Sequence, residues 1–155
     1  MNIGVTREAE GLERRVALTP SVARQLVDQK HTVWVEKGAG ERAMIPDEEY
    51  IRAGAQIAYT QPEVIRRSEL VVQVSAPAPE QLEHFSKDTV VMAFCHLAVK
   101  ARHLVDLLLD RSVTAIGYEI IEADDGRLPV LAAISEIAGQ LTIPLAMHLL
   151  RSSAG

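Results

Sequence analysis

Two neighbouring arginines near the N-terminus have the chemistry to bind a carboxylate. Arg14 and Arg15 lie in the stretch 11–20, which follows a short apolar run. Thr19 and Pro20 predict that a helix begins there, with Thr19 as its N-cap and proline at the first helical position. The planar guanidinium group donates two parallel hydrogen bonds to a carboxylate and so fixes its orientation. Arg15 is therefore a candidate anchor for a small acid, and the alternative is that both arginines are solvated surface charges.

A histidine at the end of an apolar run is the candidate for proton transfer. His96 follows the predicted strand 90–93 by three residues. An imidazole exchanges protons near neutral pH, which suits general acid–base catalysis, and a purely structural histidine is the alternative. Cys95 precedes it, but neighbours in a strand point to opposite faces, so we expect a small core residue and no Cys–His dyad. A solvent-facing position is favoured for the other histidines, His31, His84, His103 and His148.

Short β-rich runs alternate with helical patterns along the chain, and these elements must position the two candidates. The predicted strands are residues 2–5, 32–35, 56–58, 70–74, 90–93 and 114–117. The predicted helices are residues 20–29, 47–53, 63–67, 80–85, 100–111 and 135–151. Continuously apolar runs such as Leu70-Val71-Val72 are typical of parallel strands buried on both faces. The pattern predicts an α/β fold, a doubly wound Rossmann-like parallel sheet with helices on both faces.

This fold class also predicts where the chemistry lies. In doubly wound sheets, ligands collect at the carboxyl ends of the strands. Arg15 follows the first predicted strand, residues 73–77 close the fourth, and His96 closes the fifth. We therefore expect Arg15, Gln73 and His96 to converge on one edge of the sheet.

Composition limits the classes of partner. The chain has 155 residues and 48% hydrophobic content, enough for one domain with a core, or for one domain and part of a second. Its net charge of −5, without basic blocks, argues against nucleic acid or an anionic membrane as partner. A single cysteine excludes an internal disulfide, and no signal-peptide pattern opens the chain. Because no apolar run is near the roughly 20 residues of a membrane span, we expect a cytoplasmic protein without membrane insertion.

Other motifs that carry chemistry elsewhere have plain structural interpretations here. Gly38-Ala39-Gly40 is only part of a dinucleotide fingerprint, because the third glycine is replaced by Ala43 and the motif follows the second predicted strand. It is interpreted as a turn. Residues 47–49 are acidic, as in the first turn of a helix. Cys and His residues do not show metal-ligand spacing, so no metal site is predicted.

A set of motifs runs through the chain in order. They are Gly4, Glu8, Glu13 with Arg15, Val16-Ala17-Leu18-Thr19-Pro20, His31 before Val33, Glu36-Lys37-Gly38-Ala39-Gly40, Asp47, Tyr50, Ala53-Gly54-Ala55, Phe94, His96-Leu97-Ala98, Tyr118-Glu119 and Ser135-Glu136-Ile137-Ala138-Gly139. As a set they resemble the N-terminal part of the alanine dehydrogenase and pyridine nucleotide transhydrogenase family. The segment 96–98 is similar to alanine dehydrogenases and the segment 74–77 is closer to transhydrogenases; the alanine dehydrogenase side is favoured.

The resemblance implies a two-domain oxidoreductase that converts pyruvate, ammonia and NADH to L-alanine. Residues 1–134 would form the substrate domain and 135–155 an interdomain helix, while NAD would be bound mainly by a nucleotide-binding domain outside these residues. Carried over, Arg15 holds the substrate carboxylate and His96 is the acid/base for carbinolamine and imine formation. Ser135, as N-cap of the interdomain helix, would lie near the cofactor. Gln73 stands where the resemblance places a substrate-orienting lysine, and its amide can donate a hydrogen bond but supplies no positive charge.

The glutamine at position 73 and the lack of a nucleotide-binding domain within these residues imply that the chain alone is inactive. They leave open whether it is an enzyme. The alternative is a non-catalytic module that binds a small carboxylate such as pyruvate or alanine, or a subunit of a split transhydrogenase-like assembly that pairs with a nucleotide-binding subunit. A receiver or flavodoxin-like carrier is a third interpretation on fold alone. The first strand argues against it, because residues 5–8 hold neither an acidic metal-binding pair nor a hydroxyl-rich phosphate loop. The exact substrate and any homo-oligomer stay open.

Overall fold

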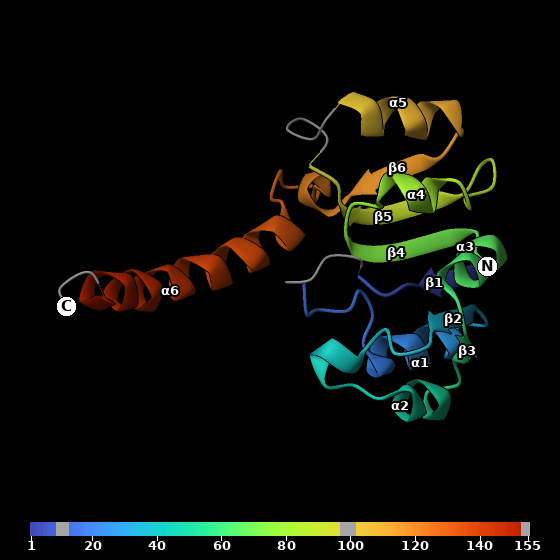
Figure 1. Cartoon of the computed structure of the whole chain (residues 1–155), viewed down its shortest axis with the longest axis horizontal. Coiled ribbons are helices and arrows are strands. Elements are labelled where there is room, and N and C mark those ends of the chain that lie inside the picture. Colours follow the sequence, from blue (N-terminus) through green and yellow to red (C-terminus); the bar gives the residue numbers. More distant parts are fainter. Residues whose placement is uncertain (9–12, 97–101, 153–155) are drawn as a thin grey trace. The chain divides into compact units, whose positions relative to one another are not determined.

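Six strands form one parallel sheet in the computed structural model, which describes residues 1–8, 13–96 and 102–152 (Figure 1). The strands are β1 (Asn2–Val5), β2 (Thr32–Glu36), β3 (Gln56–Ala58), β4 (Leu70–Ser75), β5 (Val90–Phe94) and β6 (Thr114–Gly117). Their order is β3-β2-β1-β4-β5-β6, and every neighbouring pair is parallel. This is the order of doubly wound nucleotide-binding folds, in which the direction of winding reverses between β1 and β4. The predicted α/β fold class is confirmed.

Helices cross between the strands and cover both faces of this sheet (Figure 1). They are α1 (Pro20–Asp28), α2 (Asp47–Arg52), α3 (Gln61–Arg67), α4 (Pro79–Leu82) and α5 (Arg102–Asp110), with a 3-10 turn η1 (Glu41–Ala43). One core cluster joins Val72 to Ala23 of α1 and Tyr50 of α2, and a second joins Val71 to α3, α4 and α5. Val71 and Val72 are neighbours on β4 and point to opposite faces, so the two clusters lie on the two sides of the sheet.

The strand β1 passes unusually close to helix α3, and a glycine makes this approach possible. A Cβ placed on Gly4 would lie 2.3 Å from Ser68 Oγ and 2.8 Å from Val64 Cγ1. Ser68 is itself fixed, because its hydroxyl donates to the carbonyl oxygen of Val64 at 2.7 Å. Gly4 therefore sets the separation between this strand and α3.

The predicted elements are all present, with differences at their ends. β2, β4 and β5 each extend one residue beyond the predicted end, while the other three strands have the predicted bounds. Helix α4 is shorter than the predicted 80–85 and begins at Pro79, where the side-chain oxygen of Gln81 accepts from Ala78 N at 2.6 Å. The start of the helix predicted over 100–111 lies outside the described residues.

The last 38 residues, Tyr118–Gly155, form a second compact unit with a 3-10 turn η2 (Tyr118–Ile120) and a long helix α6 (Pro129–Ser152). The predicted helix start at Ser135 is wrong. Proline suits the first helical position, the residues that follow are good helix formers, and Ala132 N already donates to Leu128 O at 2.8 Å. Ser135 therefore lies inside the helix and is not its N-cap.

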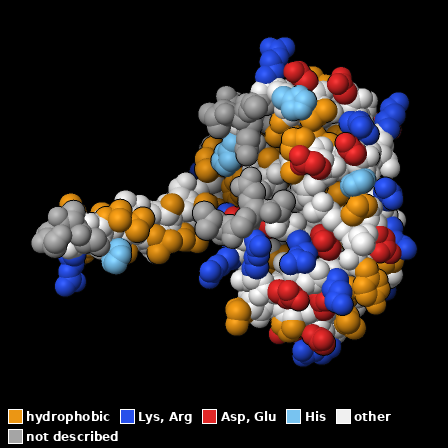
Figure 2. Space-filling view, in the orientation of Figure 1, with side chains coloured by type: hydrophobic (Ala, Val, Ile, Leu, Met, Phe, Trp, Pro, Cys, Tyr) orange, Lys and Arg blue, Asp and Glu red, His pale blue; other side chains and the backbone are white. Residues whose placement is uncertain are grey.

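Helix α6 contains a longer apolar segment than was predicted from the sequence. Its segment Pro129–Arg151 has 23 residues and a mean hydropathy of 1.5. Within the described chain, this is the one helix that is long and apolar enough to cross a membrane. The statement that no apolar run is near this length is therefore wrong. Core helices of soluble proteins can be equally long and apolar, so these two properties alone do not indicate a membrane span. Figure 2 shows hydrophobic side chains gathered along this helix.

Candidate functional site

The carboxyl ends of β1 and β4 lie side by side, and this place is the switch point of the fold, where doubly wound sheets bind their ligands. β1 pairs with β4 through Ile3, Gly4 and Val5, so both strands deliver their following residues to the same edge. Beyond Val5 the chain supplies a threonine and several charged residues. The switch point therefore gathers polar groups that could hold a ligand.

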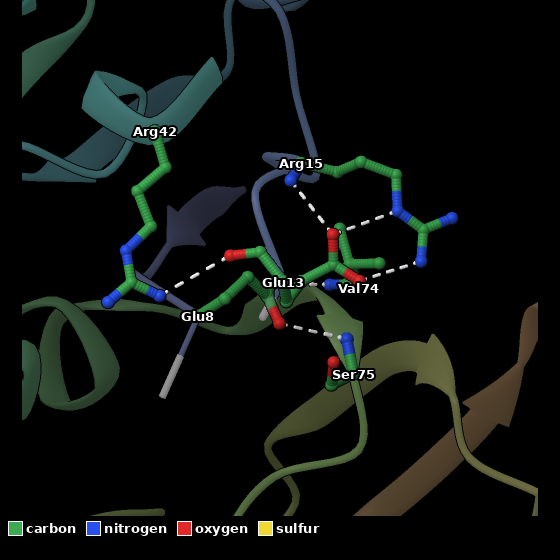
Figure 3. A network of polar contacts seen from close by, with 6 residues as sticks. All are labelled: Glu8, Glu13, Arg15, Arg42, Val74 and Ser75. Carbon is green, nitrogen blue, oxygen red and sulfur yellow. Dashed lines mark hydrogen bonds and ion pairs between the residues drawn. The ribbon is translucent and has the colours of Figure 1, made fainter. Parts of the chain in front are cut away.

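Glu8 ties the segment after β1 to the end of β4 (Figure 3). One carboxylate oxygen of Glu8 accepts from Val74 N at 2.6 Å and the other accepts from Ser75 N at 3.0 Å. The pairing of β4 with β5 shifts register between Val72 and Ser75, and the two consecutive amides point to Glu8 within this irregular stretch. The end of β4 thus has a fixed shape, held by an internal carboxylate.

Gln73 makes a second link across the same strand pair. Its side chain is 2% exposed, and its Nε2 donates to the hydroxyl oxygen of Thr6 at 2.6 Å. The other end of the amide, Oε1, is buried without a hydrogen-bond partner among the described residues. Position 73 is therefore an interior position of the switch point, which suits a neutral amide better than an unpaired ammonium group.

Arg15 and Glu13 form a two-armed ion pair in the loop after β1 (Figure 3). Arg15 Nε donates to one carboxylate oxygen of Glu13 at 2.9 Å, and Nη2 donates to the other at 2.7 Å. Arg15 N also donates to Glu13 Oε1 at 2.8 Å, while Arg42 Nη1 of η1 donates to the carbonyl oxygen of Glu13 at 3.4 Å. These bonds hold the described part of the loop around Glu13 and Arg15 in place.

The pair is strongly ionised. Hydrogen bonds from the guanidinium group lower the pKa of Glu13 from 4.5 to about 2, helped by backbone N–H groups of Arg15 and Arg14 and opposed by partial burial. The hydrogen bonds to Glu13 raise the pKa of Arg15, and the charge of Glu8 adds to this rise. Arg15 therefore lies within electrostatic reach of the carboxylate that binds the end of β4.

Arg15 keeps donors for a ligand. A guanidinium group carries five N–H donors, and Glu13 takes one from Nε and one from Nη2. The side chain of Arg15 is 54% exposed, whereas that of Glu13 is 16% exposed. The Nη1–Nη2 edge has no hydrogen-bond partner among the described residues, so a second carboxylate can approach it.

His96 follows β5, the strand next to β4. Its side chain is exposed, and its backbone adopts a φ of 46°, a left-handed conformation that is uncommon for any residue other than glycine. The imidazole stacks on Phe94, with ring centroids 6.0 Å apart and an interplanar angle of 18°. Four other non-glycine residues of the described chain, Lys30, Met44, Asp88 and Ser112, also have a positive φ, so this conformation does not single out His96. By contrast, Cys95 is buried, as the core interpretation predicted.

The loop that carries Arg15 is also fixed at its far end. Tyr50 of α2 is fully buried and donates its hydroxyl to the carbonyl oxygen of Leu18 at 2.7 Å. Burial raises the pKa of Tyr50 to about 12, so it stays a donor at any ordinary pH. Thr19 is the N-cap of α1 and Pro20 its first residue, as predicted, although the Thr19 hydroxyl bonds Ser21 Oγ at 2.9 Å and does not cap the helix.

Three of the predicted site residues lie on, or follow, neighbouring strands of the sheet. Arg15 and Gln73 belong to the connected ends of β1 and β4, and His96 follows the adjacent strand β5. Ser135 belongs to the second unit, where it lines an open hollow of about 490 Å³ with apolar residues, Gly126 and Arg127. Glu8 and Glu13 were missed as site residues by reasoning from spacing. The available signal was an acidic residue two positions before Arg15.

The glycine-rich turn after β2 does not fit a dinucleotide. Gly38, Ala39 and Gly40 form a turn, as interpreted, in which Gly38 N donates to Asp47 Oδ1 at 2.8 Å. A Cβ on Gly40 would lie 2.6 Å from the carbonyl oxygen of Ile45, and the Glu41 carboxylate lies beside Gly38. A pyrophosphate would meet a filled, negatively charged turn there, so these glycines do not fit NAD.

One known protein family matches most of the chain. The family Alanine dehydrogenase/PNT, N-terminal domain matches residues 4–138. The chain belongs to this family. The match begins within β1, includes the loop with Arg15, β4 and the end of β5, and stops after the first ten residues of α6.

Individual relatives agree with the family. The alanine dehydrogenase of Methanococcus maripaludis is 39% identical over 155 residues, which is 100% of this chain and 41% of the relative. A solved L-alanine dehydrogenase matches with a TM-score of 0.88 and 39% identity over 94% of this chain and 40% of that one. A transhydrogenase from Sinorhizobium meliloti matches with a TM-score of 0.72 and 24% identity over 77% of this chain and 35% of that one. This structural likeness shows a shared fold. The chain thus spans about two fifths of the length of the alanine dehydrogenases it matches.

Proposed function

We propose that this chain is the substrate-binding part of an alanine-dehydrogenase-type oxidoreductase, and that it holds the carboxylate of pyruvate or alanine on Arg15. The single observation that carries this proposal is the unused Nη1–Nη2 edge of Arg15 at the switch point of a chain from this family. A charge-assisted, two-armed bond orients a small acid, which a single ammonium group does not do. The substrate carbon next to the carboxylate would then face the ends of β4 and β5.

His96 would serve as the acid and base of this site. In forming an imine from pyruvate and ammonia, the amine adds to the carbonyl carbon, and the resulting carbinolamine must lose its hydroxyl group as water. An imidazolium can give this hydroxyl the proton with which it leaves as water, and the neutral imidazole then takes a proton back in the reverse direction. The exposed side chain of His96 and its place at the end of β5 support this role.

NAD would be bound mainly by a nucleotide-binding domain or subunit outside these residues, because the described residues lack a glycine-rich phosphate site. Ser135 and its hollow in the second unit are the proposed point of contact with that cofactor. Gln73 would act on substrate from within the strand end, through the network with Thr6. We expect a cytoplasmic protein whose 155 residues alone do not turn over NADH.

A non-catalytic carboxylate-binding module, or a subunit of a split transhydrogenase-like assembly, is the second candidate. The observation that favours it is the buried amide of Gln73, which gives the switch point no positive charge from β4. Both candidates use Arg15 as anchor, and they differ in whether proton transfer at His96 matters for function.

Calorimetry tests the anchor directly. Pyruvate, alanine and glyoxylate are titrated into the wild type, into Arg15→Ala and into Arg14→Ala. Loss of a charge-assisted pair costs on the order of 1.5–3 kcal/mol, so Arg15→Ala should weaken binding about tenfold or more. Arg14 is the matched control, because it carries the same charge one residue away and is exposed. Equal affinities for the wild type and Arg15→Ala would remove Arg15 from the site.

A further inference from the structure

We propose that Glu13 is a positioning residue for the ligand carboxylate: it holds one edge of the Arg15 guanidinium group and thereby presents the opposite edge to the ligand. The inference rests on the proposed function, in which Arg15 is the anchor. It adds that the ion pair between these residues is kept when the ligand binds and is not displaced by it.

The geometry of the pair separates the two edges. Glu13 binds the edge formed by Nε and Nη2, at 2.9 and 2.7 Å. The edge formed by Nη1 and Nη2 remains, with one hydrogen on each nitrogen pointing along parallel directions. A carboxylate accepts two parallel bonds of this kind, so Arg15 can bind Glu13 and a ligand at the same time.

Glu13 is itself anchored, which a positioning residue must be. Its carboxylate accepts from the backbone N–H of Arg15 at 2.8 Å, and its carbonyl oxygen accepts from Arg42 Nη1 at 3.4 Å. Its side chain is 16% exposed, against 54% for Arg15. The less exposed, more tightly bonded partner therefore fixes the more exposed one, and the mobile guanidinium group is already ordered before a ligand arrives.

Ordering Arg15 in advance lowers the cost of binding. An arginine side chain has many rotamers, and fixing such a side chain at the moment of binding costs affinity. Without Glu13, this cost would fall on each binding event. We expect Glu13→Gln to weaken pyruvate binding about two- to tenfold, because its amide cannot accept from both Nε and Nη2.

The test observes the side-chain nitrogens of Arg15 by NMR in the full chain, during a titration with pyruvate. The expected result is that the Nε–H signal exchanges slowly with water and keeps its position, while the Nη signals shift. In Glu13→Gln the Nε–H signal should lose its protection. Glu63→Gln is the matched control, because Glu63 also accepts from a nearby arginine, Arg67 at 3.0 Å, and from a backbone N–H, that of Tyr59 at 3.1 Å.

The outcomes separate the two claims. If pyruvate shifts the Nε–H signal as strongly as the Nη signals, the ligand displaces Glu13 and the inference is overturned, while Arg15 remains the anchor. If Glu13→Gln leaves the Nε–H protection unchanged, the inference is overturned as well. If no Arg15 signal responds to pyruvate, the proposed function itself fails. The titration of the wild type decides between these results even where a variant does not fold.

Discussion

At the scale of single residues, two neighbouring arginines have different surroundings. Arg14 is exposed and its side chain makes no hydrogen bond or ion pair within the described chain, whereas Arg15 is oriented by Glu13 and lies within reach of the Glu8 charge. The difference comes from a single side chain two positions before Arg15. For binding of a carboxylate, we therefore expect the direction of the Arg15 guanidinium group to matter more than the total charge of the loop.

The ionisation of Glu13 gives a prediction about stability and pH. Its pKa is depressed in the folded chain, from 4.5 to about 2, so its stabilising contribution is complete above pH 4.5 and is lost as pH falls through about 2. Because Arg15 is half exposed, solvent screens the pair and the contribution is on the order of 1 kcal/mol. Urea unfolding of the wild type and Glu13→Gln should differ by this amount at pH 5–7. A difference that stays constant down to pH 2 would contradict the assignment.

At the scale of the elements, close packing of β1 on α3 depends on Gly4. Gly4→Ala puts a methyl group within 3 Å of Ser68 and Val64, so we expect it to lower the free energy of unfolding by about 1–3 kcal/mol. Gly139→Ala is the comparison, because a Cβ at Gly139 meets nothing within 4 Å. That change should stabilise α6 by up to about 1 kcal/mol. Thermal unfolding measures both, and a harmless Gly4→Ala would refute this account of β1.

Much of the fold could be predicted from the sequence, because its apolar runs and turn residues are local signals. All six strands and the parallel topology follow from such runs. The start of α6 could not be predicted, because Ser135 followed by Glu136 imitates a helix N-terminus while Pro129 is an equally good one. The bonds of Glu8 to Val74 and Ser75 join residues 66 and 67 positions apart, and no local pattern encodes them.

At the scale of the whole molecule, the chain spans about two fifths of the alanine dehydrogenases it matches. The described residues supply a candidate anchor, a candidate acid and base, and a fixed strand end, and their Gly38–Gly40 turn does not fit NAD. Positioning of both reactants is needed for catalysis. The proposal therefore assigns the two tasks to different parts of the polypeptide or of an assembly.

This division predicts how the purified chain behaves in an assay for NADH oxidation with pyruvate and ammonia. We expect no turnover above the blank with these 155 residues alone. Addition of the nucleotide-binding domain of an alanine dehydrogenase is the constructive arm, in which activity should depend on both Arg15 and His96. Steady turnover by the chain alone, abolished by His96→Ala, would show that it binds the cofactor on a surface that this account overlooks.

The central claim is that a small carboxylate binds at the switch point between β1 and β4. Chemical-shift changes of the backbone amides in ¹H–¹⁵N NMR spectra, recorded while pyruvate is added to saturation, test it most directly. The account predicts that the largest shifts occur at Arg15, at Val74 and Ser75, and at His96, and that they weaken in Arg15→Ala. Shifts confined to the hollow at residues 123–135, or no shifts at all, would contradict it.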